Sequence, residues 1–481
     1  MKRERIGLVL GLALLVGIAV VPIPGIPDEA RRMLAVAAIM ATWWVTEAAP
    51  LAVTSLLPLA LLPPFGITNA AGAAAPYANH LVYLFLGGFM IAQAMQRWNL
   101  HRRIALRTVM AMGSSPPRLV LGFMVASAFL SMWVSNTATT AMMMPIGVAV
   151  IAEISRAVHG PKRPAPGDFP FAVCLMLGCA YGASIGGFST LIGTPPNVFL
   201  AGFLSEQLDI QITFVRWLAF AMPLTVLFLP LTWLWLTRVA FPIRIKDIPG
   251  GREPVRSAYQ ALGPLSTPEK RLSVLFGATA LAWMFRPVWT GFLPTGGLIS
   301  DSTIAMAATV LCFLVPAGNG SGERILNWEW GVKIPWDVLI LIGGGFSLAN
   351  GLEVSGLSQF LGDRLAGASA LPLPLFVIMV VVFIILLTEL ASNLASTAMM
   401  VPILAAVATG AGIPPLMLLL PVTVAASCAF MLPAATPPNA IVFGTGHFTI
   451  PQMVRAGIGV NIIGAVLTCL FAVFWVPVVF G

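Results

Sequence analysis

Apolar runs of membrane-spanning length follow one another along nearly the whole chain, with short polar loops between them. A helix needs about 20 apolar residues to cross the hydrocarbon core of a bilayer, so such runs are typical of transmembrane helices. The runs lie near residues 6–24, 32–48, 50–65, 80–98, 171–203, 213–241, 272–291, 302–316, 335–354, 414–444 and 453–480. The pattern predicts an all-α polytopic membrane protein with about eleven transmembrane helices.

Two further apolar runs, 118–155 and 372–409, are interrupted by a Ser-Asn pair near the middle, at 135–136 and 392–393. A polar group at bilayer depth costs several kcal/mol unless a partner satisfies it, so these interruptions need an explanation. Each run fits either one long helix or two short helices folded back as a re-entrant hairpin. In the second case the Ser-Asn pair lies at the tip of the hairpin.

The two Ser-Asn pairs belong to an internal duplication. Ser135 and Ser392 lie 257 positions apart, and several flanking residues repeat at the same offset. A second signature, Thr-Pro-Pro-Asn, recurs at 194–197 and 436–439, and a polar loop at 159–168 in the first copy explains its smaller offset of 242 positions. Consecutive prolines remove backbone donors and disfavour helix at the preceding threonine. Each Thr-Pro-Pro-Asn signature therefore predicts a helix that breaks near the middle of the membrane.

Composition excludes a water-soluble globule. Of 481 residues 58% are hydrophobic and only 9% are charged, and the mean hydropathy is +0.93. That leaves too little polar surface to coat a soluble fold. The formal net charge is +8, but the basic residues lie in short loops between apolar runs, so they report membrane orientation and not nucleic-acid binding.

Loop charge distinguishes hairpins from full crossings. With two hairpins and a cytoplasmic N-terminus, 21 of the 26 Lys and Arg residues lie on the cytoplasmic side, as the positive-inside rule expects. The five that remain outside are Arg31, Arg32, Arg216, Arg286 and Arg364. A crossing by the first run, or by both, would move the basic segment 242–271 outside. We therefore predict two hairpins that enter from opposite faces of the plasma membrane as an inverted-topology repeat, with the C-terminus outside.

The two tips and the two broken helices predict one central polar site. Discontinuous helices expose carbonyl groups that suit hard cations and N–H groups that suit anions. Ser and Asn oxygens with backbone carbonyls form a neutral cage for Na⁺, while Asn amides and Thr hydroxyls can hold carboxylates. No Lys or Arg is expected near either tip, so an anionic substrate needs cations beside it, which favours Na⁺ coupling. The alternative is that the small polar residues only join helices.

Two acidic residues at or near membrane depth, Glu47 and Glu389, keep two interpretations open. Such residues are functional candidates, yet a structural hydrogen bond or an interfacial position explains them equally well. Glu389 aligns with Met132 of the first copy, so it cannot be a paired element of both half-sites. The four histidines and five cysteines show neither metal-ligand spacing nor a CxxC motif, which argues against a hydrolase or metalloenzyme.

At these motifs the chain resembles the divalent anion:sodium symporter family, the dicarboxylate and citrate carriers. The likeness covers nearly the whole chain. It rests on Thr-Glu-Ala-Ala-Pro-Leu at 46–51, Trp-Val-Ser-Asn-Thr-Ala-Thr-Thr at 133–140, Gly-Thr-Pro-Pro-Asn at 193–197, Thr-Glu-Leu-Ala-Ser-Asn at 388–393 and Ala-Thr-Pro-Pro-Asn at 435–439. The resemblance implies a homodimer in which a static scaffold holds a transport domain that moves as a rigid body, like an elevator.

The resemblance also implies roles for individual residues. It places the first sodium ion at Ser131, Ser135, Asn136 and the backbone of Gly193, and the second at Thr388, Ser392, Asn393 and the backbone of Ala435. It places the substrate carboxylates at Asn136, Thr137 and Asn393, with Thr194, Pro195, Thr436 and Pro437 closing the pocket. Leu394 departs from the family, since many relatives have a threonine there that binds the second carboxylate. Both C4-dicarboxylates and citrate therefore stay open as substrates.

The expected domain organisation alternates scaffold and transport segments. We expect scaffold helices at 1–117, with an interfacial helix near 101–110, and a cytoplasmic loop with further scaffold helices at 242–371. The transport domain is expected from 118–241 (hairpin 118–155, broken helix 171–203, helix 213–241) and 372–481 (hairpin 372–409, broken helix 414–444, helix 453–480).

The function expected from the sequence is import of di- or tricarboxylates, such as succinate, malate, fumarate or citrate, by sodium symport. Na⁺ is the co-transported ion, and no organic cofactor or nucleic acid is expected. A sodium-independent dicarboxylate exchanger of the same fold is the alternative, and a passive anion channel is a third hypothesis. The hydroxyl residues four positions before each tip serine, Ser131 and Thr388, favour symport.

Overall fold

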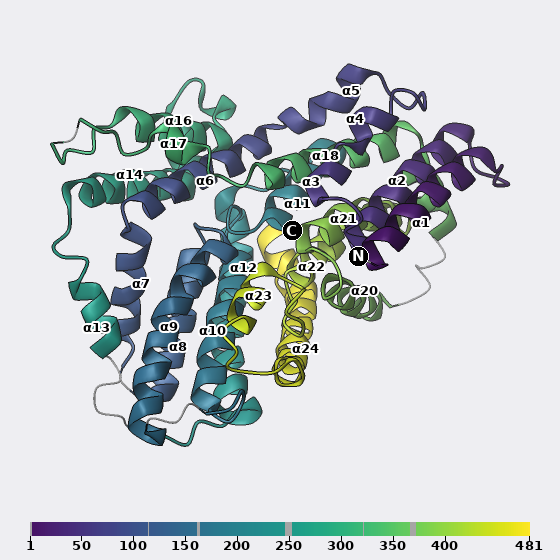
Figure 1. Cartoon of the computed structure of the whole chain (residues 1–481). Coiled ribbons are helices and arrows are strands. Elements are labelled where there is room, and N and C mark those ends of the chain that lie inside the picture. Colours follow the sequence, from purple (N-terminus) through teal and green to yellow (C-terminus); the bar gives the residue numbers. More distant parts are fainter. Residues whose placement is uncertain (1, 114, 161–163, 246–252, 321, 366–371) are drawn as a thin grey trace.

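The computed structural model describes the chain except residues 1, 114, 161–163, 246–252, 321 and 366–371 (Figure 1). The described part is built from helices, and its one β-type pairing is an isolated bridge between Pro316 and Arg324. This agrees with the predicted all-α class.

The helices before the duplication and in its first copy follow the apolar runs. The first group is α1 (Lys2–Val20), α2 (Asp28–Thr46), α3 (Leu51–Thr54), α4 (Leu57–Leu61), α5 (Ala70–Ala74), η1 (Ala75–Ala78), α6 (His80–Arg97) and α7 (Leu100–Ala111). The second is α8 (Pro116–Ser131), α9 (Asn136–His159), α10 (Pro170–Gly187), α11 (Pro195–Leu208), α12 (Phe214–Leu234) and the π-helix η2 (Trp235–Ala240).

The remaining helices form the middle segment and the second copy. The middle segment is α13 (Glu253–Gln260), α14 (Thr267–Met284), α15 (Arg286–Trp289), η3 (Thr290–Phe292), η4 (Gly296–Leu298), α16 (Asp301–Leu314), α17 (Trp328–Gly331), α18 (Trp336–Val354) and α19 (Leu357–Leu365). The second copy is α20 (Leu373–Thr388), α21 (Asn393–Gly410), α22 (Pro415–Ala426), α23 (Pro437–Phe443), α24 (Ile450–Phe474) and α25 (Val476–Phe480).

All four predicted interruptions are present as helix breaks. The runs 118–155 and 372–409 each form two helices, separated by the first tip (residues 132–135) and the second tip (residues 389–392). The first linker (residues 188–194) separates α10 from α11, and the second linker (residues 427–436) separates α22 from α23. α11 and α23 each begin with Pro-Pro, which is tolerated there because the first N–H groups of a helix have no partner within it.

Two helices differ in detail from the apolar runs of the sequence. The run 50–65 is not one continuous helix, since α3 ends at Thr54 and α4 starts only at Leu57. The helix expected near 101–110 is present as α7, but Arg103 does not lie at an open membrane surface. Its guanidinium is buried and forms an ion pair with Glu269 of α14 at 2.6 Å. A buried charge needs such a partner, and the sequence did not reveal it.

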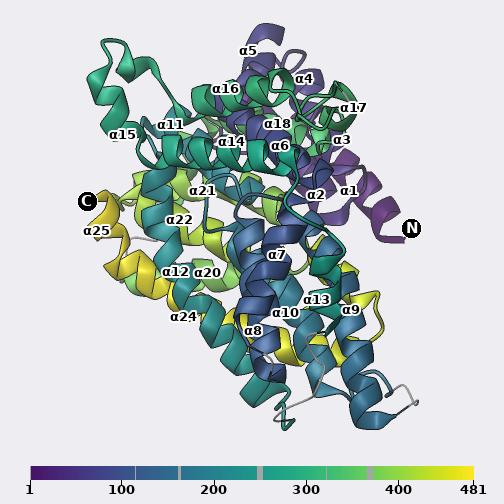
Figure 2. The same cartoon turned by 90° about the vertical axis from the view of Figure 1, so that its left-hand side faces the viewer.

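The helices lie in two layers, one above the other in Figures 1 and 2. The upper layer contains α3–α6 and α14–α18, and the lower layer contains α7–α10, α12, α20, α22 and α24. α18 packs against both α11 and α21, so elements of both copies meet the upper layer. Among the described residues, seven helical segments are long and apolar enough to cross a membrane, or eight if the pair 267–284 and 286–292, bent by 71°, is one span.

Equivalent elements of the two copies pack in equivalent ways. Within each copy the second hairpin helix lies against the first half of the broken helix, as α9 against α10 and α21 against α22. Between the copies α9 packs against α23 and α21 packs against α11. Each hairpin thus contacts the second half of the other copy's broken helix.

Small residues let α8 and α10 approach closely in the first copy. Gly182 and Gly186 lie one helical turn apart on α10, and a side chain on either would overlap backbone atoms of Met124 or Ala128 on α8. Close backbone packing of this kind is common between membrane helices. It holds the first hairpin directly against the segment that leads into the first linker.

Candidate functional site

At the first tip a serine hydroxyl orients the asparagine that opens α9. Ser131 Oγ, at the end of α8, donates a hydrogen bond to Oδ1 of Asn136. Ser135 is the N-cap of α9, and its hydroxyl oxygen accepts from the N–H of Ala138 at 3.3 Å. The cap starts the helix with Asn136 as its first residue, beside free N–H groups that carry partial positive charge.

The second tip repeats this arrangement with a threonine. Thr388 Oγ1 lies 2.8 Å from Oδ1 of Asn393 and 2.7 Å from the carbonyl oxygen of Ala426, so its single proton serves one of the two acceptors at a time. Asn393 is the first residue of α21, as Asn136 is of α9. The hydroxyl–asparagine pairs expected at both half-sites are thus brought together.

The first linker closes directly onto the first tip. A side chain added to Gly193 would overlap the carbonyl oxygen of Gly187 and lie 2.9 Å from that of Ser131. One added to Gly187 would overlap the Asn136 side chain. The structure therefore gathers Ser131, Asn136 and Gly193, three of the residues expected around the first sodium ion. Their oxygens are hydroxyl, amide and carbonyl groups, which suit a hard monovalent cation.

The second linker carries Ala435 in the equivalent position. Ala435 is buried, and its N–H donates to the carbonyl of Leu432 at 3.2 Å. Ser392 is half-buried and its carbonyl accepts from the N–H of Ser396 at 2.9 Å, inside α21. Among the described residues no three His, Cys, Asp or Glu side chains group as a metal site. The side chains expected around the second ion, Thr388, Ser392 and Asn393, are themselves uncharged.

The asparagine that ends each Thr-Pro-Pro-Asn signature donates hydrogen bonds to backbone carbonyls of its own linker, and so acts as a brace for it. Asn197 Nδ2 donates to the carbonyl of Thr190 at 2.7 Å and to that of Phe188 at 3.3 Å. Asn439 Nδ2 donates to the carbonyls of Ala429 at 2.9 Å and Leu432 at 3.0 Å. Leu432 and Thr190 are equivalent positions of the two copies. The sequence showed the repeated asparagine, but its role as a brace depends on backbone partners that no pattern reveals.

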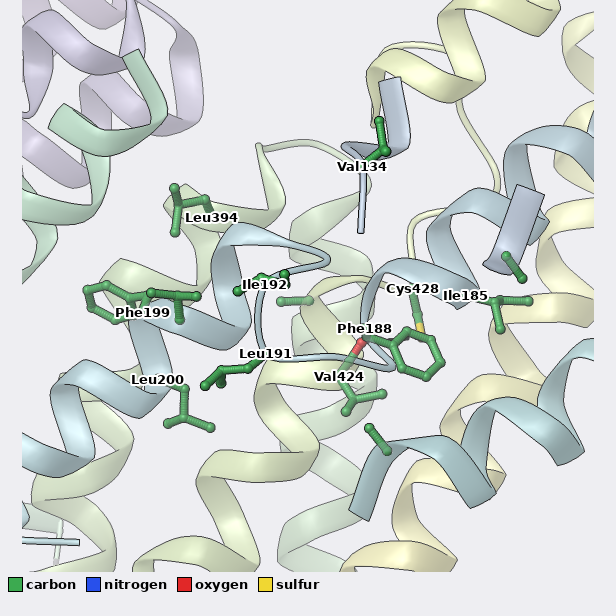
Figure 3. Close-up of a cluster of buried hydrophobic side chains, with 14 of the residues drawn as sticks. Val134, Ile185, Phe188, Leu191, Ile192, Phe199, Leu200, Leu394, Val424 and Cys428 are labelled. Atoms are coloured by element: carbon green, nitrogen blue, oxygen red, sulfur yellow. Dashed lines mark hydrogen bonds between the residues drawn. The ribbon is translucent and has the colours of Figure 1, made fainter. Parts of the chain in front are cut away.

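The residues expected at the substrate differ between the two copies in exposure. Thr137 is exposed and Asn136 and Asn393 are half-buried, whereas Leu394 is only 4% exposed. Leu394 belongs to the apolar cluster of Figure 3, with Ile192 of the first linker and Phe199 of α11.

The four linker residues expected to close the pocket lie where α11 and α23 begin. Thr194 and Thr436 are the N-cap residues of these helices and both are buried. The hydroxyl of Thr436 accepts from the N–H of Asn439 at 3.4 Å, while Thr194 makes no such cap bond. Pro437 is exposed and Pro195 half-buried.

Glu389 is bound by hydrogen-bond donors only, which supports the structural interpretation of this residue. Its Oε1 accepts from the N–H groups of Phe430 at 2.7 Å and Met431 at 2.8 Å, and from Asn461 Nδ2 at 2.8 Å. Its Oε2 accepts from the N–H of Leu432 at 3.1 Å. Four donors match a carboxylate, which accepts and does not donate. The other acidic residue, Glu47, is the C-cap of α2, and its backbone has the left-handed conformation with φ of 54°.

One expectation about charge at the tips is wrong. Arg3 of α1 donates from Nη2 to the carbonyl oxygen of Leu390 in the second tip at 2.7 Å, and also to the carbonyl of Val45. A guanidinium therefore contacts the backbone of the second tip, although 387 residues separate the two positions in sequence. α1 packs against α2, and α2 packs against α21 of the second copy, which brings the two positions together.

A family model and two named transporters match this chain over almost its full length. The model of the family described as "Sodium:sulfate symporter transmembrane region" matches residues 2–481. A protein of Staphylococcus saprophyticus named sodium-dependent dicarboxylate transporter SdcS is 41% identical, over 99% of this chain and 92% of its own length. The protein of the same name from Staphylococcus aureus is 40% identical with the same coverage.

Two solved transporter structures share the fold. The YdaH transporter of Alcanivorax borkumensis aligns with a TM-score of 0.60 and 15% identity, over 100% of this chain and 99% of that one. The MtrF efflux pump of Neisseria gonorrhoeae aligns with a TM-score of 0.60 and 14% identity, over 99% and 95% of the two chains. At this level of identity the likeness concerns the fold alone.

Proposed function

The chain belongs to the sodium:sulfate symporter family of membrane transporters, and we propose that it imports dicarboxylates by sodium symport. It is a multi-pass transporter and not an enzyme. The observation that carries the proposal is the matched pair of tips, in which Ser131 fixes Asn136 and Thr388 fixes Asn393. The sodium-dependent dicarboxylate transporters that are about two-fifths identical support the same coupling.

In this proposal one Na⁺ binds at each tip. The first ion takes oxygens of Ser131, Ser135, Asn136 and the Gly193 backbone, and the second takes those of Thr388, Ser392, Asn393 and the Ala435 backbone. These groups carry no net charge, so each bound ion adds a full positive charge beside the pocket. That charge offsets the desolvation of an anionic substrate, which is why ions and substrate bind together.

The substrate carboxylates lie between the tips, at Asn136, Thr137 and Asn393. α9 and α21 both begin there, and the N-terminal ends of helices favour anions. Thr194, Pro195, Thr436 and Pro437 border the same space. Leu394 offers no hydroxyl to the second carboxylate, so succinate, malate and fumarate are held mainly from the first copy, and citrate is the competing substrate.

The movement that exposes the site to either side is an elevator-like shift of the transport domain against the scaffold. The transport domain comprises 118–241 and 372–481, and the scaffold comprises 1–117 and 242–371 and forms the homodimer contact. The crossed packing of α9 with α23 and α21 with α11 supports an inverted repeat within the moving part. The N-terminus is cytoplasmic and the C-terminus is outside, as loop charge favours.

Uptake by purified protein in liposomes tests the coupling. Three sets of vesicles are compared: one with an inward Na⁺ gradient, one with an inward K⁺ gradient and one without a gradient. Labelled succinate or labelled citrate is added outside. Symport predicts accumulation above the equilibrium level only with inward Na⁺. Uptake that ignores Na⁺ but requires an internal dicarboxylate would identify an exchanger and overturn the proposal, and a non-saturating anion conductance in planar bilayers would identify a channel.

A further inference from the structure

The two copies attach the hairpin tip to the linker by different chemistry. In the first copy the hydroxyl of Thr190 donates to the carbonyl oxygen of Met132 at 2.5 Å. In the second copy the equivalent positions are Leu432 and Glu389, and the Glu389 carboxylate accepts from the Leu432 N–H. One neutral hydrogen bond in the first copy is therefore replaced by a carboxylate with four donors in the second.

The contacts of Glu389 leave the second linker little freedom. The carboxylate takes the N–H groups of three consecutive residues, 430–432. On the carbonyl side, Asn439 binds Ala429 and Leu432, and the Tyr181 hydroxyl donates to Phe430 at 2.7 Å. These bonds fix the direction in which the peptide groups of the linker point.

Glu389 also joins three separate elements. It follows Thr388, the residue that orients Asn393, and it is 3% exposed. Asn461 of α24 reaches the same carboxylate oxygen as the linker. Bonds between a carboxylate and N–H donors are stronger than neutral ones. The second tip, the second linker and α24 are therefore held by one side chain.

We propose that Glu389 is the positioning residue of the second sodium half-site: its carboxylate holds the second linker against the tip and so sets how the oxygens of Thr388, Asn393 and the Ala435 backbone are placed for a cation. This inference rests on the proposed sodium symport. Glu389 itself touches no ion. The first half-site keeps its shape by close packing at Gly187 and Gly193, so it does not need such a clamp.

The test compares sodium dependence of succinate uptake in liposomes for the wild type and three variants. Glu389→Gln keeps the size of the side chain but sets an amide N–H₂ against backbone donors. We expect the Na⁺ concentration for half-maximal uptake to rise about tenfold, because hydrogen bonds to a charged group are lost. Glu389→Asp keeps the carboxylate and should restore part of the affinity. Thr190→Val removes the neutral hydrogen bond to the Met132 carbonyl in the first copy. It should change the half-maximal Na⁺ concentration less than about threefold.

A double variant separates positioning from a general loss of structure. Glu389→Met with Leu432→Thr places in the second copy the two residue types that form the hydrogen bond of the first copy. The introduced threonine hydroxyl can donate to the carbonyl at position 389, as Thr190 donates to Met132. We expect it to bind Na⁺ more tightly than Glu389→Met alone. All variants are compared by monodispersity in detergent and by the rise in Tm that Na⁺ produces, which a merely destabilised protein retains.

The outcomes are distinct for the inference and for the proposed function. If wild-type uptake does not respond to Na⁺, the proposed symport fails. If the wild type responds and Glu389→Gln shows the same half-maximal Na⁺ concentration and the same Na⁺-induced rise in Tm, the positioning role is wrong. Equal sodium affinities in Glu389→Met with and without Leu432→Thr would also overturn it.

Discussion

The hydroxyl of Thr388 lies 2.8 Å from Oδ1 of Asn393, and Ser131 binds Asn136 in the same way in the other copy. In each tip a residue at the end of one short helix thereby sets the side-chain orientation of the residue that opens the next. The amide oxygen of the asparagine points toward the end of the preceding hairpin helix, where sodium is proposed to bind. This pairing gives the two tips their shared chemistry.

Asn136→Ala and Asn393→Ala should each abolish Na⁺-driven succinate accumulation. Each removes an amide that is proposed to bind both sodium and substrate. Folded protein should remain, because both side chains are only half-buried. Uptake in liposomes measures the effect, with the exposed Gln211→Ala as a control that should transport normally. Wild-type sodium dependence in both alanine variants would mean that the sites lie elsewhere.

Thr388→Val should weaken sodium binding while Thr388→Ser should not. Valine keeps the volume but removes the hydroxyl that contacts Asn393 and Ala426, and one lost hydrogen bond is worth about 0.5–1.5 kcal/mol. We expect the half-maximal Na⁺ concentration to rise at least about tenfold, because the hydrogen bond and one proposed oxygen ligand of the second ion are lost together. Titration of uptake against Na⁺ measures it. Equal effects of valine and serine would show that shape and not the hydroxyl matters.

Gly187→Ala should disrupt the first half-site. The added methyl group would overlap the Asn136 side chain, which must then leave its hydrogen bond with Ser131. Na⁺-dependent uptake should fall at least about tenfold, since a displaced ligand costs the site a hydrogen bond and a coordinating oxygen. Gly17→Ala in α1 is the matched control, because its methyl group meets no atom within 4 Å. Normal transport by Gly187→Ala would show that Asn136 does not need its present orientation.

Leu394→Thr should shift preference from citrate toward C4-dicarboxylates. A threonine hydroxyl can bind the second carboxylate, which leucine cannot, and the gain is about 0.5–1.5 kcal/mol. Since Leu394 is buried in the same apolar cluster as Ile192 and Phe199, some stability should be lost as well. Competition of unlabelled succinate and citrate against labelled succinate gives the ratio of affinities. An unchanged ratio would mean that position 394 does not contact substrate.

The sequence predicts the helix breaks of the site better than its hydrogen bonds. Ser-Asn and Thr-Pro-Pro-Asn locate all four breaks because prolines and capping residues act on the local backbone. The braces formed by Asn197 and Asn439 could not be predicted, since their partners are backbone carbonyls. The contact of Arg3 with Leu390 joins segments from opposite ends of the chain. Such contacts depend on how helices pack, and loop charge or hydropathy does not encode that packing.

The central claim is that sodium and dicarboxylate cross the membrane together through the twin tips. Coupling is reciprocal, so a substrate gradient must also drive the ion. Liposomes are prepared with equal Na⁺ concentrations on both sides and an inward succinate gradient. Those that contain the wild-type protein should accumulate labelled sodium, and those that contain Asn393→Ala should not. Succinate entry without any movement of labelled sodium would contradict the account.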